Sequence, residues 1–120
     1  QPMVKLHDMI TDHLLLVLAS SHCPPCLEAL EALDEFARIR PRLNAVLLID
    51  TPFHRLEGIR GLYNHHVQVY MMPSSLMEAQ LGIKAVPACF CLGPGGIVLG
   101  SAAPAGLSEL NAVCAGGERI

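Results

Sequence analysis

Two cysteines separated by two prolines are the residues of this chain whose types and spacing best suit chemistry. Cys23 and Cys26 stand in the stretch SSHCPPCLEAL, directly after the apolar run from Leu14 to Ala19. A thiol pair between a buried strand and a helix can exchange electrons, hold a metal ion or stay chemically inert. The pattern of a strand, C-x-x-C and a helix favours the redox interpretation.

Redox chemistry needs a cysteine that loses its proton easily, because the thiolate is the nucleophile. We expect Cys23 at the N-terminus of a helix, where free N–H groups and the helix dipole present roughly half a positive charge. Cys26 falls one turn later, so the spacing suits attack by Cys23 and resolution by Cys26. His22 adds positive charge when protonated. Pro24 and Pro25 oppose this effect because they lack two first-turn N–H donors, and Pro25 is expected to be the first regular helical residue.

A metal site is the alternative use of the same pair. Structural zinc needs four ligands, usually as two close pairs, and Cys89 with Cys91 is the available second pair. Those two stand in an apolar run, and Cys114 in a late helical stretch, where small buried side chains are the expected role. Further candidate ligands, without a recognisable spacing, are His22, His54, His65 and His66. A metal-binding or metallochaperone module is therefore the alternative function, while the redox interpretation predicts no bound metal or other cofactor.

Length and composition limit the classes of protein to which this chain can belong. The chain has 120 residues, of which 52% are apolar and 16% charged, which predicts one globular domain. Its net charge is -3 and its Lys and Arg are scattered, so we expect no nucleic-acid partner. No apolar run approaches the ~20 residues that span a bilayer. Because the chain begins with Gln1, we expect a processed or trimmed piece, which leaves a membrane anchor possible outside this segment.

Hydrophobic periodicity predicts alternating strands and helices. The expected strands are 14–19, 45–50, 67–72, 88–92 and 97–100, and the expected helices are 25–39, 54–64, a short helix through Leu81, and 106–115. Residues 1–13 suit either a short strand or a helical turn. Ser74 or Ser75 is expected to cap the third helix, Glu78 suits a capping box with Ser75, and Gly82 suits the end of the helix. This order predicts an α/β fold with a largely parallel central sheet, helices on both faces and an antiparallel C-terminal hairpin.

Two separated motifs resemble the thioredoxin superfamily. The first is VLASSHCPPCLEAL, and the second is LGIKAVPACFCLGPGGIVLG, which is similar to the family's Gly-Ile-x-x-Val/Ile-Pro segment. Together they cover most of residues 14–115 and imply a single thioredoxin-like domain over residues 1–120, with its core at about 14–115. The resemblance also implies that Pro87 is cis and faces the cysteines, and that Val86 offers backbone groups to a bound peptide.

The predicted helix and strand between residues 54 and 72 indicate which branch of the superfamily this chain resembles. An insertion there is similar to the TlpA/ResA-like and MauD-like thiol-disulfide oxidoreductases. That likeness implies exchange of a Cys23–Cys26 disulfide or dithiol with protein thiols through a mixed disulfide. It also implies protein thiol or disulfide substrates, an upstream redox partner protein, and a membrane-anchored position outside the cytoplasm.

Three positions depart from the common pattern of that superfamily. His22 replaces the tryptophan before the first cysteine, Val17 replaces a buried acidic residue, and Ala88 replaces the threonine after the proline. These departures favour a specialised partner and leave the proton acceptor of Cys26 open. Asp50, which ends a predicted strand, is a candidate acceptor, although a loop carboxylate more often caps the next turn.

Overall fold

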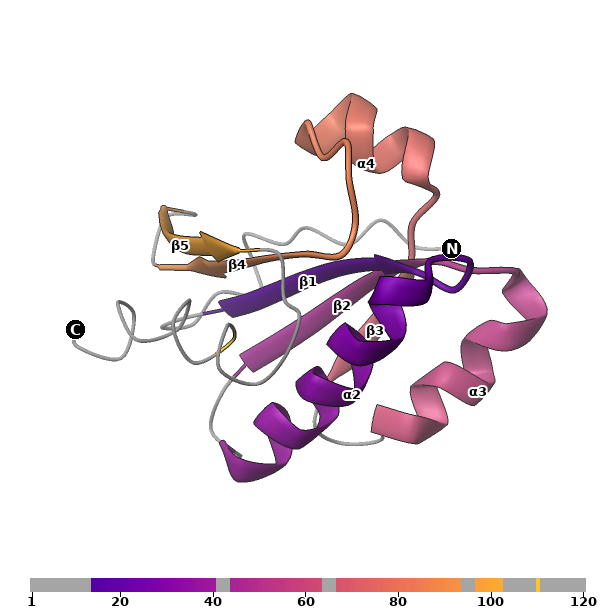
Figure 1. Cartoon of the computed structure of the whole chain (residues 1–120), viewed down its shortest axis with the longest axis horizontal. Coiled ribbons are helices and arrows are strands. Elements are labelled where there is room, and N and C mark those ends of the chain that lie inside the picture. Colours follow the sequence, from indigo (N-terminus) through magenta and orange to yellow (C-terminus); the bar gives the residue numbers. More distant parts are fainter. Residues whose placement is uncertain (1–13, 41–43, 64–66, 94–96, 103–109, 111–120) are drawn as a thin grey trace.

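The hydrophobic runs of the sequence form one five-stranded sheet. A computed structural model describes residues 14–40, 44–63, 67–93, 97–102 and 110, and Figure 1 shows their arrangement. The strands are β1 (Leu14–Ser20), β2 (Asn44–Asp50), β3 (Gln68–Met71), β4 (Ala88–Leu92) and β5 (Val98–Ala102). The helices are α2 (Pro24–Ile39), α3 (Phe53–Tyr63) and α4 (Ser74–Leu81). Across the sheet the strand order is β3-β2-β1-β4-β5.

Strand β1 lies in the middle of the sheet, as its unbroken apolar run predicts. All seven of its residues are buried. It pairs in parallel with β2, from Leu14 opposite Asn44 to Ser20 opposite Asp50, and antiparallel with β4 on its other side. Because β1 and β2 end opposite each other, the residues that follow Ser20 and Asp50 meet at one edge of the sheet.

Helices cover both faces of the sheet, as predicted. In Figure 1, α2 and α3 lie against one face and α4 lies against the other. Successive side chains of a strand point to opposite faces. The odd-numbered residues of β1 therefore pack with Phe36 of α2 and Leu56 of α3, whereas the even-numbered ones from Leu14 to Leu18 pack with Met77 of α4. The cysteine-bearing helix and α4 thus lie on opposite sides of the same central strand.

The start of α2 differs from the prediction by one residue. The helix begins at Pro24 rather than Pro25, and Cys23 is its N-cap residue with extended backbone angles (φ -110°, ψ 109°). The first two positions of a helix tolerate proline, since their N–H groups have no partner inside the helix. Cys23 therefore directly precedes the first turn.

The predicted capping box at α4 is wrong. The helix begins at Ser74 with Pro73 at its N-cap, and no side chain of the cap residue bonds to the first turn. Ser75 lies inside the first turn, two positions after the N-cap residue. The αL backbone of Gly82 (φ 70°) ends α4 as predicted.

Two predicted segments lie outside the described residues: residues 1–13 and, apart from Leu110, the closing helix 106–115. Leu110 is fully buried and packs in the core on the α2 side of the sheet. Among the helices that the structure describes, none is long and apolar enough to cross a membrane.

Candidate active site

The ends of β1 and β2 position the two cysteines. The Ser21 N–H donates to the Asp50 carbonyl at 3.0 Å, which ties the turn after β1 to the end of β2. The Cys23 N–H donates to the Ser20 carbonyl at 3.3 Å, and the Cys26 N–H donates to the Cys23 carbonyl at 3.0 Å. These bonds fix Cys23 at the positive end of the α2 dipole.

Cys23 is the reachable thiol of the pair. It is partly exposed, whereas Cys26 has no exposed surface. The Sγ atom of Cys23 lies 3.6 Å from the carbonyl oxygen of Val86 and donates to it. The Val86–Pro87 peptide bond is cis, as the resemblance implies. The segment that contains Val86 therefore lies against the reachable sulfur, although 63 residues separate the two in sequence.

Cys26 is a buried thiol that keeps its proton. Its pKa is raised to about 12, mainly by burial and then by a hydrogen bond with the Cys23 side chain. The Ser20 N–H, which donates to the Cys26 Sγ at 3.5 Å, acts in the opposite direction. The pair is therefore unequal: one sulfur is accessible at a helix N-terminus, and the other is buried and neutral beneath it.

The residues that flank Cys23 lie at the surface. His22, Pro24 and Pro25 are all exposed. The His22 N–H donates to the Ser20 Oγ at 3.1 Å and so helps to fix the turn. The structure places all three residues around the reachable thiol, and the influence of the His22 imidazole on Cys23 stays a prediction.

Asp50 caps a helix, but not at the turn that directly follows it. Its Oδ2 accepts the Ser74 N–H at 3.1 Å and the Ser74 Oγ–H at 2.6 Å. Ser74 begins α4, whose first N–H groups have no partner inside the helix. The expectation of a local cap is wrong because this carboxylate reaches a helix that begins 24 residues later. No local sequence pattern could have connected the two residues.

Thr51 is a buried polar residue that the sequence did not single out. It is 4% exposed, and its Oγ1 has no hydrogen-bond partner among the described residues. Ile49, two positions earlier, packs in the same core cluster as Cys26. Thr51 directly follows the last residue of β2. The sequence shows that this residue carries a hydroxyl group, but it does not show that the residue is buried.

Cys89 and Cys91, the other cysteines that the structure describes, do not join the Cys23–Cys26 pair in a metal site. Cys89 and Cys91 are buried in β4, where they pack in the core as expected. Cys114 lies outside the described residues. Within the described part of the chain, no group of three or more His, Cys, Asp or Glu side chains could hold a metal ion.

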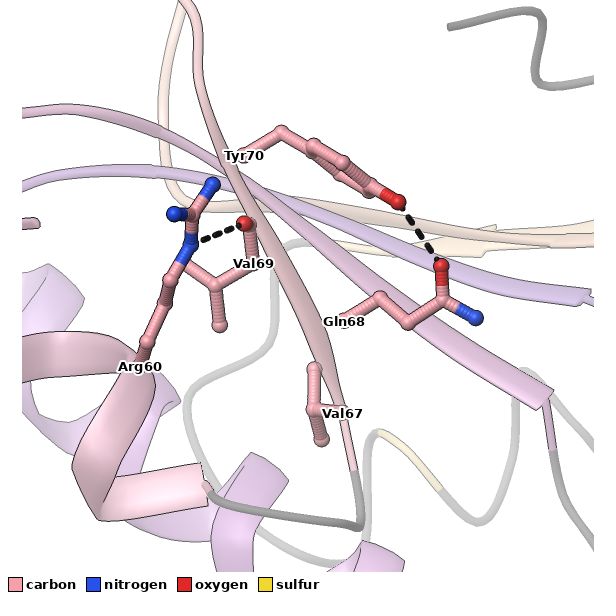
Figure 2. A pocket seen from close by; sticks show the side chains of 5 residues that line it. All are labelled: Arg60, Val67, Gln68, Val69 and Tyr70. Atoms are coloured by element: carbon pink, nitrogen blue, oxygen red, sulfur yellow. Dashed lines mark hydrogen bonds between the residues drawn. The ribbon is translucent and has the colours of Figure 1, made fainter. Parts of the chain in front are cut away.

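One cavity lies beside Val86 and another lies at strand β3. The first, of about 160 Å³, lies between α4 and the segment before Pro87, and its lining residues are Ser74, Ser75, Met77, Glu78, Ile83, Lys84, Ala85 and Val86. The second, of about 300 Å³, lies at strand β3, and its lining residues are Arg60, Val67, Gln68, Val69 and Tyr70 (Figure 2). Val86 is the one lining residue of the smaller cavity that also contacts Cys23.

Comparisons with known proteins show which solved structures have a similar fold. No protein-family model and no curated protein matches the sequence. A secreted disulfide oxidoreductase of Mycobacterium tuberculosis, homologous to DsbE of E. coli, is similar with a TM-score of 0.71 and 13% identity over 94% of this chain and 85% of that one. A thioredoxin-like protein from Aeropyrum pernix has a TM-score of 0.73 and 15% identity over 93% and 81%. The exposed lipoprotein thioredoxin of Streptococcus pneumoniae has a TM-score of 0.69 and 19% identity over 96% and 90%.

These likenesses extend over nearly all of this chain and over most of each solved structure. They agree with the mixed sheet, with the helices on both of its faces, and with the two motifs that suggested this fold. This chain therefore has a thioredoxin-like fold, with the Cys23–Cys26 pair and the cis-Pro87 segment side by side.

Proposed function

We propose that this protein is a thiol-disulfide oxidoreductase that exchanges a Cys23–Cys26 dithiol or disulfide with protein thiols. One observation carries the proposal, namely the unequal surroundings of the two sulfurs. Cys23 is partly exposed against the Val86 carbonyl, and Cys26 is buried one turn below it. This arrangement suits a nucleophile and a resolving thiol. The likeness to a secreted disulfide oxidoreductase supports the same function.

In the reducing direction, the Cys23 thiolate attacks one sulfur of a substrate disulfide. A bond forms between the Cys23 Sγ and that sulfur, the substrate S–S bond breaks, and the second substrate sulfur leaves as a thiolate. Cys26 then loses its proton and attacks the Cys23 Sγ, which forms the Cys23–Cys26 disulfide and releases the first substrate sulfur. Two electrons pass to the substrate, and its two thiolates take up the two protons that Cys23 and Cys26 release.

The surrounding residues have supporting roles in this proposal. The backbone of Val86, beside cis-Pro87, lines the path of a substrate chain whose sulfur is joined to Cys23. Pro24 and Pro25 hold the turn that presents the nucleophile. His22, exposed next to Cys23, favours the thiolate when its imidazole is protonated.

The proposed partners are protein substrates and a second redox protein. Each turnover in the reducing direction leaves Cys23 and Cys26 oxidised, so an upstream dithiol protein must return two electrons. We place this chemistry outside the cytoplasm. That placement is supported by the likeness to one protein that is secreted and to another that is an exposed lipoprotein.

A trapping experiment tests the function. With Cys26→Ser, the mixed disulfide on Cys23 has no resolving thiol, so covalent complexes with protein substrates should accumulate in non-reducing gels. Cys23→Ser is the matched control and should trap nothing. Absence of complexes with an intact Cys23 would contradict the proposal. Stoichiometric zinc or copper in protein purified under reducing conditions, lost in Cys23→Ser, would favour the metal-binding alternative.

The direction of electron flow needs a second measurement. Reduction potentials of such pairs span about -270 to -120 mV, from reductants to strong oxidants. An equilibrium titration of the Cys23–Cys26 pair against glutathione gives its position in that range. A pair that never forms a disulfide in this titration would contradict the proposed function.

A further inference from the structure

We infer that Ser20 is a catalytic residue of the resolving step, in which its backbone N–H stabilises the Cys26 thiolate. The inference rests on the proposed function, because Cys26 becomes a thiolate only to resolve a mixed disulfide on Cys23. It gives a chemical role to the last residue of β1, a serine to which the spacing of the cysteines does not point.

Ser20 contacts both members of the cysteine pair through its backbone. Its N–H donates to the Cys26 Sγ at 3.5 Å, and its carbonyl oxygen accepts the Cys23 N–H at 3.3 Å. The pairing of β1 with β4 ends at Leu18, so Ser20 lies beyond that ladder and its N–H is directed to a sulfur. One residue therefore connects the central strand with both cysteines at the start of α2.

The Ser20 N–H faces the atom on which negative charge develops. In the resolving step the Cys26 Sγ releases its proton to water and attacks the Cys23 Sγ. The bond between Cys23 and Cys26 forms, and the bond from Cys23 to the substrate sulfur breaks. That sulfur leaves as a thiolate and takes up a proton from water.

Burial makes this contact important for the resolving thiol. Cys26 has no exposed surface, so bulk water does not supply a donor to its sulfur. Burial and the Cys23 side chain raise the pKa of Cys26, and among the described contacts that act on this pKa the Ser20 N–H is the one that lowers it. A hydrogen bond to an ionised acceptor is stronger than one to a neutral acceptor, and a donor already in place needs no reorganisation as charge forms. The contact therefore stabilises the thiolate more than the thiol.

The Ser20 hydroxyl fixes the orientation of this donor. Its Oγ accepts the His22 N–H at 3.1 Å, while the Ser20 carbonyl accepts the Cys23 N–H. Serine closes short turns in this way, through a side-chain bond to the backbone two residues later. The two bonds set how β1 joins α2, and with it the distance from the Ser20 N–H to the Cys26 Sγ. The hydroxyl is thus a positioning group for the same step.

The first test removes only the N–H. Replacement of Ser20 by its α-hydroxy acid converts the Ala19–Ser20 amide into an ester and keeps the side chain. The reduced protein reacts with DTNB, an aromatic disulfide, and releases one thionitrobenzoate when Cys23 attacks and a second when Cys26 resolves the mixed disulfide. Every protein carries Cys114→Ser, so that Cys114 does not react with DTNB. We expect the second release to slow by about 10- to 100-fold, as for loss of a hydrogen bond to a charged group, and the first to change by less than about twofold.

The same exchange at Val46 is the control. Val46 is buried in β2, where it pairs with Leu16 on one side and Gln68 on the other, so its ester weakens the sheet without touching either cysteine. It should leave both releases unchanged. An unchanged second release in the Ser20 ester would overturn the inference and leave the proposed function intact. Absence of a second release in the protein with an unaltered backbone would overturn both.

The second test changes only the side chain. Ser20→Ala removes the bond to His22 and should slow the second release by about 2- to 10-fold, whereas Ser20→Thr keeps a hydroxyl and should restore it. A merely structural role would slow both releases alike in Ser20→Ala. That result, or a second release at the wild-type rate in Ser20→Ala, would overturn the positioning role of the hydroxyl.

Discussion

Cys26 holds its proton more tightly than an ordinary thiol because it is buried beneath Cys23. Its pKa of about 12 means that the thiol is protonated at neutral pH, whereas only a thiolate can resolve a mixed disulfide on Cys23. Burial, the larger cause of the shift, persists in the mixed disulfide, although the hydrogen bond with the Cys23 thiol does not. The resolving step is therefore the step most sensitive to pH.

We predict that resolution speeds up by about tenfold for each pH unit between roughly 6 and 9, because the thiolate fraction rises tenfold per unit well below the pKa. A mixed disulfide between Cys23 and a peptide, prepared at low pH and then shifted to higher pH, allows the release to be timed by mass spectrometry. A rate that does not change over this range would show that a base removes the Cys26 proton within the protein.

The hydroxyl of Thr51 leads to a prediction about stability. A buried polar group without a partner costs about 1 to 3 kcal/mol, and valine has nearly the same shape without the hydroxyl. We expect Thr51→Val to raise the free energy of unfolding of the reduced protein by about 1 kcal/mol, as measured in urea. Ser101→Ala, at an exposed position of β5, is the control and should change little. A less stable Thr51→Val protein that also resolves mixed disulfides more slowly would instead give this hydroxyl a role in proton transfer.

Among the individual residues of the site, the sequence identified those that belong to short contiguous motifs. The spacing of Cys23 and Cys26 is local, and Pro87 belongs to a second contiguous motif. The roles of Asp50 and Thr51 were harder to predict, because they depend on which residues pack beyond the end of β2. A carboxylate that binds a helix 24 residues later leaves no local pattern.

Among the elements, α4 depends most on residues outside itself. Asp50 accepts two hydrogen bonds from Ser74, and α4 in turn forms one wall of the cavity beside Val86. Loss of this cap should therefore lower the stability of α4 and loosen one wall of that cavity. The stop signal of Gly82 predicted the end of this helix correctly. The predicted cap was wrong because a Ser-x-x-Glu pattern records only what the helix itself offers.

We expect Asp50→Ala to lower the free energy of unfolding by about 1 kcal/mol, a typical loss for a helix N-cap. Asp50→Asn keeps an acceptor oxygen and should retain most of the stability, while Glu31→Ala removes an exposed carboxylate of α2 and should have little effect. Urea unfolding measures all three variants. Equal stability of Asp50→Ala and wild type would contradict the cap. An altered pH profile of resolution in Asp50→Asn would indicate that this carboxylate takes the Cys26 proton.

For the whole molecule, sequence analysis predicted the fold class because strands and helices alternate along the chain, and the two motifs supplied the family resemblance. Periodicity alone does not state the order of strands across the sheet. Among the strands that the structure describes, that order places β3 at one edge, where it pairs with β2 on one side only. An unpaired strand edge presents backbone groups on which another chain can add a strand.

Arg60 protects this edge. Its Nε donates to the Val69 carbonyl at 3.0 Å, as Figure 2 shows, and its guanidinium also pairs with Glu57 at 2.9 Å. The Arg60 side chain therefore forms a hydrogen bond with a backbone carbonyl of the edge strand and places a positive charge beside this strand. Charged side chains at strand edges oppose pairing with a second copy of the chain.

We predict that Arg60→Ala promotes self-association, because it frees the Val69 carbonyl and removes the charge from the β3 edge. Sedimentation velocity of the reduced protein over a hundredfold range of concentration should show a dimer fraction that rises in this variant and not in wild type. Arg38→Ala is the matched control, since it removes an exposed arginine that pairs with Asp34 on α2, away from the edge. If both variants associate equally, the loss of a positive charge at any position, and not the exposed edge, is the cause. If neither associates, the edge is protected by its short length, since β3 has only four residues.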